Sequence, residues 1–587
     1  MEIGKVGVVG CGTMGSGICE IVARSGVPVS FVEMSGEQVE AGLARIRSSL
    51  DRAVDRGKLS EQDRDAVLDR IDGDTSYDVL GDADLIVEAV PEKLDIKQET
   101  FRRLDEVAKP DAILATNTSS LPVTDIAVTT HRASRILGFH FFNPAPVMKL
   151  IELVTTVVTD PQVIADARDF AERIGKTPVV AKDRAGFVAN LLLFPYLNQA
   201  VGMYESGYAS REDIDAAMKL GTGHPMGPLA LMDLIGLDSA YAIMMRMYEQ
   251  FGDTRHAPRP IVRQLLAAEF AGRKAGRGFY SYVEAGEPAT EDERSATAVD
   301  VSVIDQWTKV GVLGTGTMAT GIAEVSAKAG FEVVVRGRTA EKAEKAKSSV
   351  AKSLTKAVDR GKLDAEARDA ALERITTTTE LADFGDCDIV IEAVAEDLAL
   401  KQELFGQLDS VTKPEAVLGT TTSSMPVIDC AMATGRPEQV VGIHFFNPAA
   451  IMRLVEVVPT VRTADRTTDQ ARAFAAKVGK HPVLCGDRAG FIVNALLFPY
   501  LNDAVKMLEE GYASVNDIDQ AMKLGCGHPM GPFELMDIVG LDVTLEIVKA
   551  LYAEFREPGF EPAPLLGHMV SAGYLGRKAG RGFHVYS

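Results

Sequence analysis

Cysteine is scarce in this chain of 587 residues, which has only six. These cysteines form no CxxC pair and have no His/Cys ligand spacing, so a disulfide framework and a zinc site are both disfavoured. The six are Cys11, Cys19, Cys387, Cys430, Cys485 and Cys526. We expect reduced, packed thiols and no bound metal.

Long apolar runs and excess positive charge are also missing. No stretch of about 18 apolar residues occurs, and the N-terminal MEIGKVGVVGCGTMG enters a glycine-rich loop without the apolar core of a signal peptide. The 62 Lys plus Arg residues face 83 Asp plus Glu, a net charge of −21, which is the wrong sign for general attraction to nucleic acid or anionic membranes. We therefore expect a cytoplasmic protein that binds neither.

Glycine and proline are too few for a fibrous or low-complexity chain. The 52 Gly and 26 Pro accompany 46% hydrophobic and 25% charged residues, the composition of ordinary globular proteins. At about 150 residues per domain, the length predicts roughly four domains.

The chain consists of two copies of one sequence. The segment HFFNP at 140 returns at 444, and GHPMGP at 223 returns at 527, both with an offset of 304 residues. The same offset relates DRAGF at 183 and 487 and GRKAGRGF at 272 and 576, so no insertion separates the copies. A period this long excludes a solenoid, whose repeats are about 20 to 50 residues. The acidic, Ala/Ser/Thr-rich segment between them predicts a linker.

Each copy shows two patterns in succession. Its first 180 or so residues alternate short Val/Ile-rich runs with amphipathic stretches, which indicates βαβ units on a mainly parallel sheet. From the DRAGF segment onward the periodicity is helical throughout. We expect α/β plus all-α architecture, with Rossmann-like domains at 1–182 (copy 1) and 307–486 (copy 2), helical domains at 183–283 and 487–587, and a linker at 284–306.

A glycine-rich loop follows the first strand of each copy. In copy 1 it reads GCGTMG, in copy 2 GTGTMA, and both lie between a strand and a helix, which is the context of a dinucleotide-binding fingerprint. Glycine lets the backbone N–H groups and the positive helix end approach a pyrophosphate. The predicted cofactor contacts from these loops are Gly10, Gly12, Met14 and Gly15 in copy 1, and Gly314, Gly316, Met318 and Ala319 in copy 2.

The second strand of each copy ends differently. Glu33 closes it in copy 1, where a carboxylate can accept hydrogen bonds from ribose hydroxyls and repel a 2′-phosphate, so we expect NAD there. In copy 2 the equivalent residue is Gly337, flanked by Arg336 and Arg338, which favours NADP because guanidinium groups bind a 2′-phosphate. Continued use of NAD beside solvated arginines, or a decayed cofactor site, are the alternatives for copy 2.

Polar residues near the predicted strand ends carry a specific resemblance. NTSS at 117, HFFNP at 140, Glu152, and DRAGF at 183 with Asn190 together resemble the 3-hydroxyacyl-CoA dehydrogenase family over nearly all of each copy. Two departures are that Leu191 and Ala495 follow the key asparagine where the family usually has arginine, and that Thr421 replaces Asn117 in copy 2. The resemblance implies an oxidoreductase that acts on acyl-CoA esters, with helical domains that pair within one chain or between chains.

The resemblance also implies roles for individual residues. Oxidation of a secondary alcohol needs a base for the hydroxyl proton, which a histidine supplies near neutral pH, with a carboxylate to hold its other nitrogen. Hydrogen-bond donors then fix the reacting oxygens. The implied catalytic residues are Ser119, His140, Glu152 and Asn190 in copy 1, and Ser423, His444, Glu456 and Asn494 in copy 2.

Further contacts follow from the same family pattern. Glu92 with Lys97, and Glu396 with Lys401, resemble the cofactor contacts that the family makes just after a strand. Basic side chains on the excursion after the second strand would meet the phosphates of CoA. The implied substrate-binding residues are Arg52, Arg56, Lys58, Asn117 and Asn143 in copy 1, and Lys356, Arg360, Lys362 and Asn447 in copy 2.

Two rival hypotheses remain open. In the first, the same fold oxidises a free hydroxy acid or sugar acid, and CoA plays no part. In the second, copy 2 is a non-catalytic binding or regulatory module that sits on copy 1. The resemblance favours 3-hydroxybutyryl-CoA and acetoacetyl-CoA as substrates and two complete enzyme units in one chain.

Overall fold

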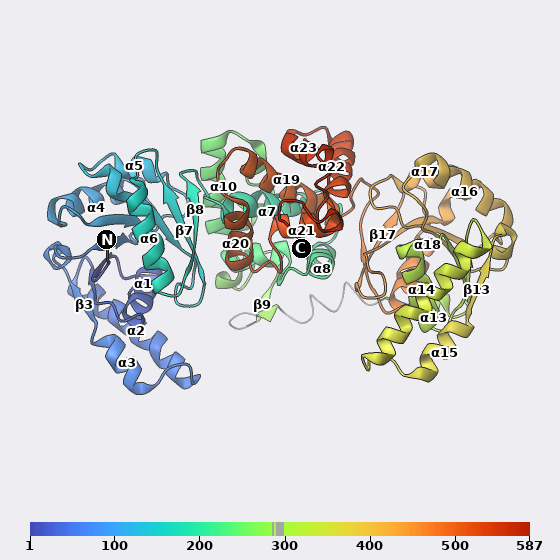
Figure 1. Cartoon of the computed structure of the whole chain (residues 1–587), viewed down its shortest axis with the longest axis horizontal. Helices are drawn as coiled ribbons and strands as arrows, with labels where there is room; N and C mark the ends of the chain where they lie inside the picture. The colour runs from blue at the N-terminus through green and yellow to red at the C-terminus, as the bar shows by residue number, and fades with distance from the viewer. Residues whose placement is uncertain (284–286, 289–298, 587) are drawn as a thin grey trace.

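The computed structural model describes residues 1–283, 287–288 and 299–586. It forms a row of three parts, with one α/β domain at each end and the two helical domains packed together between them (Figure 1). The predicted fold class, two Rossmann-like domains each followed by a helical domain, is confirmed.

Each α/β domain is built on an eight-stranded sheet. The strand order is β3-β2-β1-β4-β5-β6-β7-β8 in copy 1 and β13-β12-β11-β14-β15-β16-β17-β18 in copy 2, and only the β6/β7 and β16/β17 pairs are antiparallel. The copy 1 strands are β1 (Val6–Val9), β2 (Val29–Val32), β3 (Ile71–Asp74), β4 (Leu85–Glu88), β5 (Ile113–Thr116), β6 (Ile136–Phe141), β7 (Leu150–Thr155) and β8 (Thr177–Lys182). Those of copy 2 are β11 (Lys309–Leu313), β12 (Glu332–Arg336), β13 (Ile375–Thr378), β14 (Ile389–Glu392), β15 (Val417–Thr420), β16 (Val440–Phe445), β17 (Leu454–Pro459) and β18 (His481–Leu484).

Helices cover both faces of each sheet, which explains why the central strands read as continuous apolar runs. In copy 1 one face is covered by α1 (Thr13–Arg24), α2 (Gly36–Asp55), α3 (Glu61–Leu68) and α6 (Pro161–Arg173), the other by α4 (Leu94–Val107) and α5 (Val123–Ala127). The copy 2 equivalents are α13 (Thr317–Lys328), α14 (Ala340–Asp359), α15 (Ala365–Glu373), α18 (Asp465–Lys477), α16 (Leu398–Val411) and α17 (Val427–Ala431). Strand order reverses between β1 and β4, and in such sheets a ligand crevice opens at that point.

The helical domains share a single hydrophobic core. Its centre is the pair α7 (Ala189–Glu205) and α19 (Val493–Glu509), which are apolar on nearly all sides and lie side by side. Around them are α8 (Arg211–Thr222), α9 (Pro228–Ile235), α10 (Leu237–Phe251) and α11 (Pro260–Ala267), with α20 (Val515–Gly525), α21 (Pro532–Val539), α22 (Leu541–Phe555) and α23 (Pro564–Ser571) from copy 2.

The helical domains also contact the opposite sheets. Helix α20 of copy 2 packs on β7 and β8 of copy 1, and α8 of copy 1 packs on β17 and β18 of copy 2. At these contacts there is no room for extra atoms, because a Cβ on Gly525 would lie 2.8 Å from Leu150 and one on Gly221 would lie 2.9 Å from Leu454. A helix of each copy therefore packs closely against the last two strands of the other copy's sheet.

The predicted linker at 284–306 lies largely outside the described residues. Of its described parts, β10 (Glu287–Pro288) pairs with β9 (Tyr282–Val283), and a short 3₁₀ helix, Val301–Ile304, packs against α18. The side chain of Ile304 is fully buried there. The packed part of copy 2 thus begins ahead of residue 307.

All six cysteines are free thiols, five of them buried. Over the described ranges no three His, Cys, Asp or Glu side chains gather as a metal site. No single described helix is long and apolar enough to cross a membrane. The helices α9 and α10 together have the length and composition for it, but they are bent by 98° with respect to each other.

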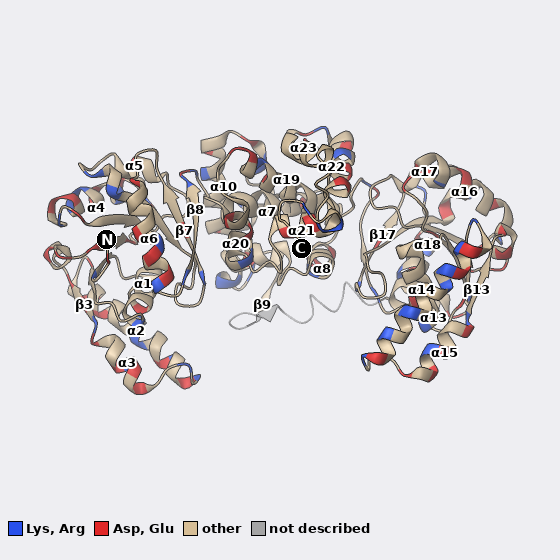
Figure 2. Ribbon diagram, viewed as in Figure 1, with Lys and Arg blue, Asp and Glu red and all other residues tan. Residues whose placement is uncertain are grey.

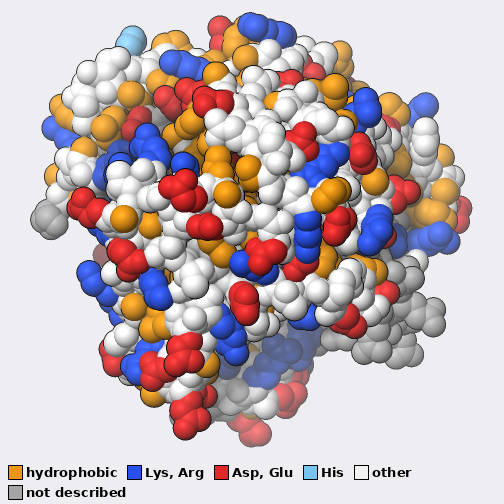
Figure 3. Space-filling model, turned by 90° about the vertical axis from the view of Figure 1, so that its right-hand side faces the viewer, with side chains coloured by type: hydrophobic (Ala, Val, Ile, Leu, Met, Phe, Trp, Pro, Cys, Tyr) orange, Lys and Arg blue, Asp and Glu red, His pale blue; other side chains and the backbone are white. Residues whose placement is uncertain are grey.

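Acidic and basic residues intermingle along the whole ribbon and on the face at the copy 2 end (Figures 2 and 3).

Candidate active site

A buried histidine–glutamate pair forms where β6 and β7 run side by side. Antiparallel pairing sets His140 directly opposite Glu152, so both side chains project from the same face of the sheet. His140 Nδ1 lies 2.7 Å from Glu152 Oε2. The carboxylate is fully buried and the imidazole is 6% exposed. Glu152 therefore engages Nδ1 and leaves the other ring nitrogen, Nε2, outside this contact.

The second carboxylate oxygen of Glu152 ties the sheet to the helical domain. It accepts hydrogen bonds from the backbone N–H groups of Val188 and Ala189, at 3.0 and 2.9 Å. These N–H groups belong to the start of α7, and the positive end of a helix stabilises a buried negative charge. Glu152 is therefore anchored by the helix while it orients His140.

Copy 2 repeats this arrangement. His444 stands opposite Glu456 in the β16/β17 register, with Nδ1 2.7 Å from Oε2. Glu456 Oε1 accepts from the N–H groups of Ile492 and Val493 at 3.0 and 2.9 Å. The two copies thus hold their histidines by equivalent bonds.

Two aromatic rings fix each imidazole. Phe142 and Phe187 lie 4.8 and 5.5 Å from His140 between ring centroids, and Phe446 and Phe491 are their equivalents around His444. Phe187 has a φ of 47°, a left-handed conformation that is unusual for a bulky residue. The strain is localised one residue before the N–H groups that hold Glu152. The sequence analysis did not identify these rings as parts of the site.

In each copy the predicted serine follows the fifth strand, and the predicted asparagine lies at the start of the first helix of the helical domain. Asn190 follows Ala189 at the start of α7, and Ser119 stands in the loop after β5. In copy 2, Asn494 Nδ2 donates to the backbone oxygen of Ser423 at 3.3 Å. A cavity of about 720 Å³ brings both together with His444 and the glycine-rich loop.

The serine loop is held by a buried network that the sequence analysis did not foresee. Lys97 donates to Glu88 at 2.7 Å and lies 3.2 Å from Glu92, and its side chain is only 1% exposed. Glu92 Oε1 in turn accepts from the Thr118 hydroxyl and the N–H of Ser119, at 2.6 and 3.0 Å. Although burial opposes ionisation, Lys97 and these bonds hold the pKa of Glu92 below its usual value.

In copy 2 the same network joins Lys401, Glu392, Glu396, Thr422 and Ser423. The structure thus places Lys97 and Lys401 as buried supports for the serine loop, with their ammonium groups already engaged by carboxylates. The sequence did offer one sign that Glu88 and Glu392 belong to the site: each is the last residue of its strand and begins an identical EAV segment.

The glycine-rich loops form a close-packed cradle. Gly10 has a φ of 89°, and a Cβ there would lie 2.9 Å from the Ala89 carbonyl. A Cβ on Gly15 would come within 1.8 Å of the Gly10 carbonyl. Gly12 caps α1 without a side-chain hydrogen bond, which leaves the first N–H groups of the helix available to an anion.

Copy 2 keeps this cradle with one change. Gly314 has a φ of 136° and Gly316 caps α13 without a side-chain bond, as in copy 1. Ala319 takes the third position of the glycine-rich loop. Its Cβ lies 3.4 Å from the place that a Cβ on Gly314 would occupy, which is an ordinary van der Waals distance. Met14 and Met318 face the cavities of their copies.

The two cavities differ where the second strand ends. In copy 1 a cavity of about 980 Å³ is lined by Gly10, Gly12, Met14 and Glu33, and Glu33 Oε1 accepts from the N–H of Cys11 at 2.6 Å. In copy 2 no side chain exists at Gly337, where a Cβ would lie 2.8 Å from Ala343 N.

Basic residues surround this position in copy 2. Arg336 Nε donates to the Thr379 carbonyl at 3.0 Å, Arg338 is exposed, and both line the cavity. Lys342 stands where copy 1 has Gln38. At the end of the second strand the charged side chain is therefore acidic in copy 1, and the charged side chains are basic in copy 2.

Of the remaining predicted substrate contacts, Asn447 lines the copy 2 cavity together with His444, and the basic residues lie outside that cavity. The basic residues Arg52, Arg56, Lys58, Lys356, Arg360 and Lys362 are all exposed on the projecting hairpins α2–α3 and α14–α15 (Figure 2). Asn117 Oδ1 accepts from the N–H of Phe141 at 2.9 Å, so it braces the strand that carries His140. In the part of copy 2 that the structure describes, its counterpart Thr421 makes no such side-chain bond, and its N–H donates to the Glu392 carbonyl. Asn143 and Asn447 are exposed just beyond the ends of β6 and β16.

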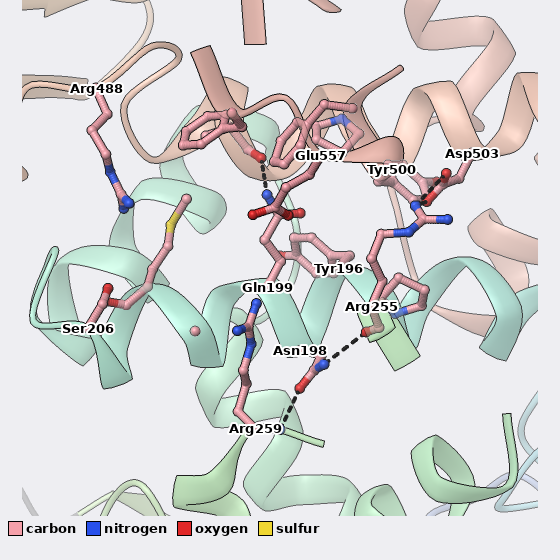
Figure 4. Close-up of a pocket in the computed structure, with 18 residues that line it drawn as sticks. Tyr196, Asn198, Gln199, Ser206, Arg255, Arg259, Arg488, Tyr500, Asp503 and Glu557 are labelled. Carbon is pink, nitrogen blue, oxygen red and sulfur yellow. Dashed lines mark hydrogen bonds and ion pairs between the residues drawn. The ribbon is translucent and has the colours of Figure 1, made fainter. Parts of the chain in front are cut away.

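A further cavity, of about 260 Å³, lies between the helical domains and includes none of the predicted site residues (Figure 4).

Comparison with known proteins relates both parts of each copy to the same group. The family model "3-hydroxyacyl-CoA dehydrogenase, NAD binding domain" matches residues 5–184 and 309–488, and "3-hydroxyacyl-CoA dehydrogenase, C-terminal domain" matches 186–282 and 490–586.

Individual relatives agree with these matches. A 3-hydroxybutyryl-CoA dehydrogenase of Mycobacterium tuberculosis (strain ATCC 25618 / H37Rv) is 48% identical over 284 residues, 48% of this chain and 99% of the relative. The mitochondrial hydroxyacyl-coenzyme A dehydrogenase of Sus scrofa is 42% identical over 284 residues, 47% of this chain and 90% of the relative. The crystal structure of 3-hydroxybutyryl-CoA dehydrogenase from Escherichia coli K12 covers 98% of this chain and all of its own, with a TM-score of 0.72 and 26% identity.

Proposed function

The chain belongs to the 3-hydroxyacyl-CoA dehydrogenase family, and from this premise we propose that each of its two copies interconverts 3-hydroxybutyryl-CoA and acetoacetyl-CoA. The names of several relatives support the short acyl chain. The observation that carries the proposal is the buried His–Glu pair, with N–O distances of 2.7 Å in both copies. Its position beside a glycine-rich cradle is what alcohol oxidation by a dinucleotide requires.

In this mechanism His140 acts through its free nitrogen, Nε2. The imidazole takes the proton of the substrate hydroxyl as the C–O bond becomes a carbonyl, and Glu152 stabilises the imidazolium that results. Ser119 and Asn190 donate hydrogen bonds that fix the reacting oxygens. Gly10, Gly12 and Met14 would hold the dinucleotide, which would supply the hydride acceptor for the same carbon. In the reverse direction the imidazolium returns its proton.

The two copies use different dinucleotides in this proposal. Copy 1 takes NAD(H), because Glu33 stands where the adenosine ribose would lie and would repel a 2′-phosphate. Copy 2 takes NADP(H), because Arg336 and Arg338 surround a position without a carboxylate. The support is that the side chains at the end of the second strand carry opposite charges in the two copies.

Single-copy variants test both parts of the proposal. His140→Ala leaves only copy 2 to turn over, and His444→Ala leaves only copy 1. We expect each to lose one of the two acetoacetyl-CoA reductions by about 10²- to 10⁴-fold, the NADH-linked reaction in the first and the NADPH-linked reaction in the second. No reduction of acetoacetyl-CoA by the wild type with either dinucleotide would overturn the function.

Other outcomes of this experiment address copy 2 alone. If His140→Ala shows no turnover with either dinucleotide, copy 2 is a partner of copy 1 and not a second enzyme. Turnover of His140→Ala with NADH alone would show that copy 2 has kept NAD, against the cofactor assignment.

We also propose that the protein is a cytoplasmic monomer whose domain divisions are 1–182, 183–283, 307–486 and 487–587, with Val301–Ile304 added to the first domain of copy 2. The shared core of the two helical domains supports the monomeric state, because it already supplies within one chain the pairing that separate subunits would otherwise make. Light scattering coupled to gel filtration should give a mass near 63.0 kDa. A mass of twice that value would contradict the proposal.

A further inference from the structure

Three arginines line the cavity between the helical domains (Figure 4). Arg255 is fully engaged, because its guanidinium bonds both oxygens of Asp503 at 2.9 Å and also pairs with Asp253. Arg488 and Arg259 make no ion pair within the described ranges. Figure 4 shows their side chains extending into the cavity from opposite sides.

Arg488 is held in place but not neutralised. Its guanidinium carbon lies 3.7 Å from the centre of the Tyr208 ring, which fixes the plane of the group. Its Nε is buried without a hydrogen-bond partner. A buried donor left unsatisfied is costly, so such a group is normally completed by a ligand or an ordered solvent molecule.

The equivalent position on the other side of the molecule is neutralised. There Arg184 stacks over Tyr512, as Arg488 does over Tyr208, but it forms an ion pair with Glu510. The residue that corresponds to Glu510 is Ser206, which has no charge to offer Arg488. The acid is therefore absent on the side of Arg488, where this cavity lies.

A second difference makes space for Arg259. Its guanidinium rests against Gly202, where a Cβ would lie 2.9 Å from Nε, whereas copy 2 has Lys506 at the equivalent position and Ala563 in place of Arg259. The two changes exchange one cation for another: copy 1 lacks the lysine side chain and has a guanidinium in the space beside Gly202. Glu557 also lines the cavity and pairs with no cation among the described residues, so within them the unpaired charges there are two guanidiniums and one carboxylate.

We propose that this cavity is a binding site for a small anion of the phosphate or carboxylate class, held between Arg488 and Arg259. A planar, pre-oriented guanidinium suits both groups, which accept two parallel hydrogen bonds from it. The site lies behind the copy 2 active site. Gln199, which lines it, donates to the backbone oxygen of Ala495 at 2.8 Å, next to Asn494. It is separate from both dinucleotide cavities.

Calorimetric titration tests the site, with inorganic phosphate and succinate as probes at constant ionic strength. We expect saturable binding of at least one probe, with one site per chain. Phosphate alone, or succinate alone, would identify the class of anion. Absence of saturable heat with both would overturn the proposal.

Variants taken from the other side of the molecule locate the binding. Ser206→Glu supplies Arg488 with the acid that Arg184 already has, and Arg259→Ala introduces the residue found in copy 2. Each should weaken binding by about tenfold or more, because a charge-assisted hydrogen bond is lost. Glu557→Gln should strengthen it by removing a like charge. Arg466→Ala, an exposed arginine outside the cavity, is the matched control.

Thermal unfolding gives a second readout that does not depend on turnover. A ligand that binds only the folded state raises the melting temperature. The wild type and Arg466→Ala should show this rise with the bound probe, and Ser206→Glu should not. Equal shifts in all three proteins would assign the binding to another surface and overturn the proposal.

Discussion

His224 and His528 stack their rings face to face where the two copies meet, with centroids 3.9 Å apart and planes inclined by 13°. Each Nδ1 faces a tyrosine hydroxyl, that of Tyr196 at 3.5 Å and that of Tyr500 at 3.3 Å. Burial lowers the pKa of His224 to about 4, and burial together with His224 lowers the pKa of His528 well below its usual value. The stack thus consists of two neutral rings.

Acid should weaken the molecule through this stack. Both pKa values are lower in the folded chain than in the unfolded chain, so the unfolded state binds more protons below about pH 6.5, and the free energy of unfolding falls as the pH drops towards 4. For His224 alone the loss at pH 5 is about 2 kcal/mol. Urea unfolding at pH 8 and pH 5 measures it.

The control for this prediction is the double variant His224→Gln, His528→Gln. Burial raises the pKa of nearby Asp215 to about 7, which has the opposite effect on stability, but that group is present in both proteins. The variant should therefore lose less stability between the two pH values than the wild type. Equal losses would show that the stack does not titrate.

Removal of the carboxylate under the serine loop should slow copy 1. Glu92→Ala leaves Thr118 and the N–H groups of Ser119 and Ser120 without their acceptor. Measured in a His444→Ala background, NADH-linked turnover should fall by about ten- to a hundredfold. Exposed Glu106→Ala is the comparison, and equal rates for the two variants would mean that the loop keeps its place unaided.

The basic hairpin of copy 1 should distinguish CoA esters from other substrates. Replacement of Arg52, Arg56 and Lys58 by alanine should raise KM for acetoacetyl-CoA by about tenfold, because charge-assisted contacts to phosphates are lost. KM for acetoacetyl-pantetheine, which lacks the nucleotide, should not change. No change for either ester would favour a substrate without CoA.

If the two copies use different dinucleotides, as proposed above, the chain should exchange reducing equivalents between them. Copy 2 would reduce acetoacetyl-CoA with NADPH and a proton, and copy 1 would reoxidise the product with NAD⁺, so a trace of ester would convert NADPH and NAD⁺ into NADP⁺ and NADH. Chromatography of the four nucleotides follows the conversion. His140→Ala and His444→Ala should each abolish it, and a mixture of the two should restore it. Conversion without ester would contradict this route.

Much of the architecture follows from local patterns. Strand-helix alternation, glycine loops and the 304-residue offset predict the paired Rossmann-like and helical domains, and the antiparallel register explains why His140 and Glu152 meet. The network of Glu88, Lys97 and Glu92 was not foreseen, because burial of a lysine depends on contacts that periodicity does not encode. The crossed packing of α8 and α20, and the unpaired state of Arg488, depend on which surfaces meet in three dimensions.

Covalent fusion removes a constraint that symmetry imposes on a homodimer. In two identical subunits one codon specifies both sides of an interface, so every pocket, charge or gap at the junction occurs twice. In this chain Ser206 and Glu510 are encoded separately, and so are Gly202 and Lys506. The junction can therefore carry a feature on one side only, and each half can be altered by mutation without a matching change in the other.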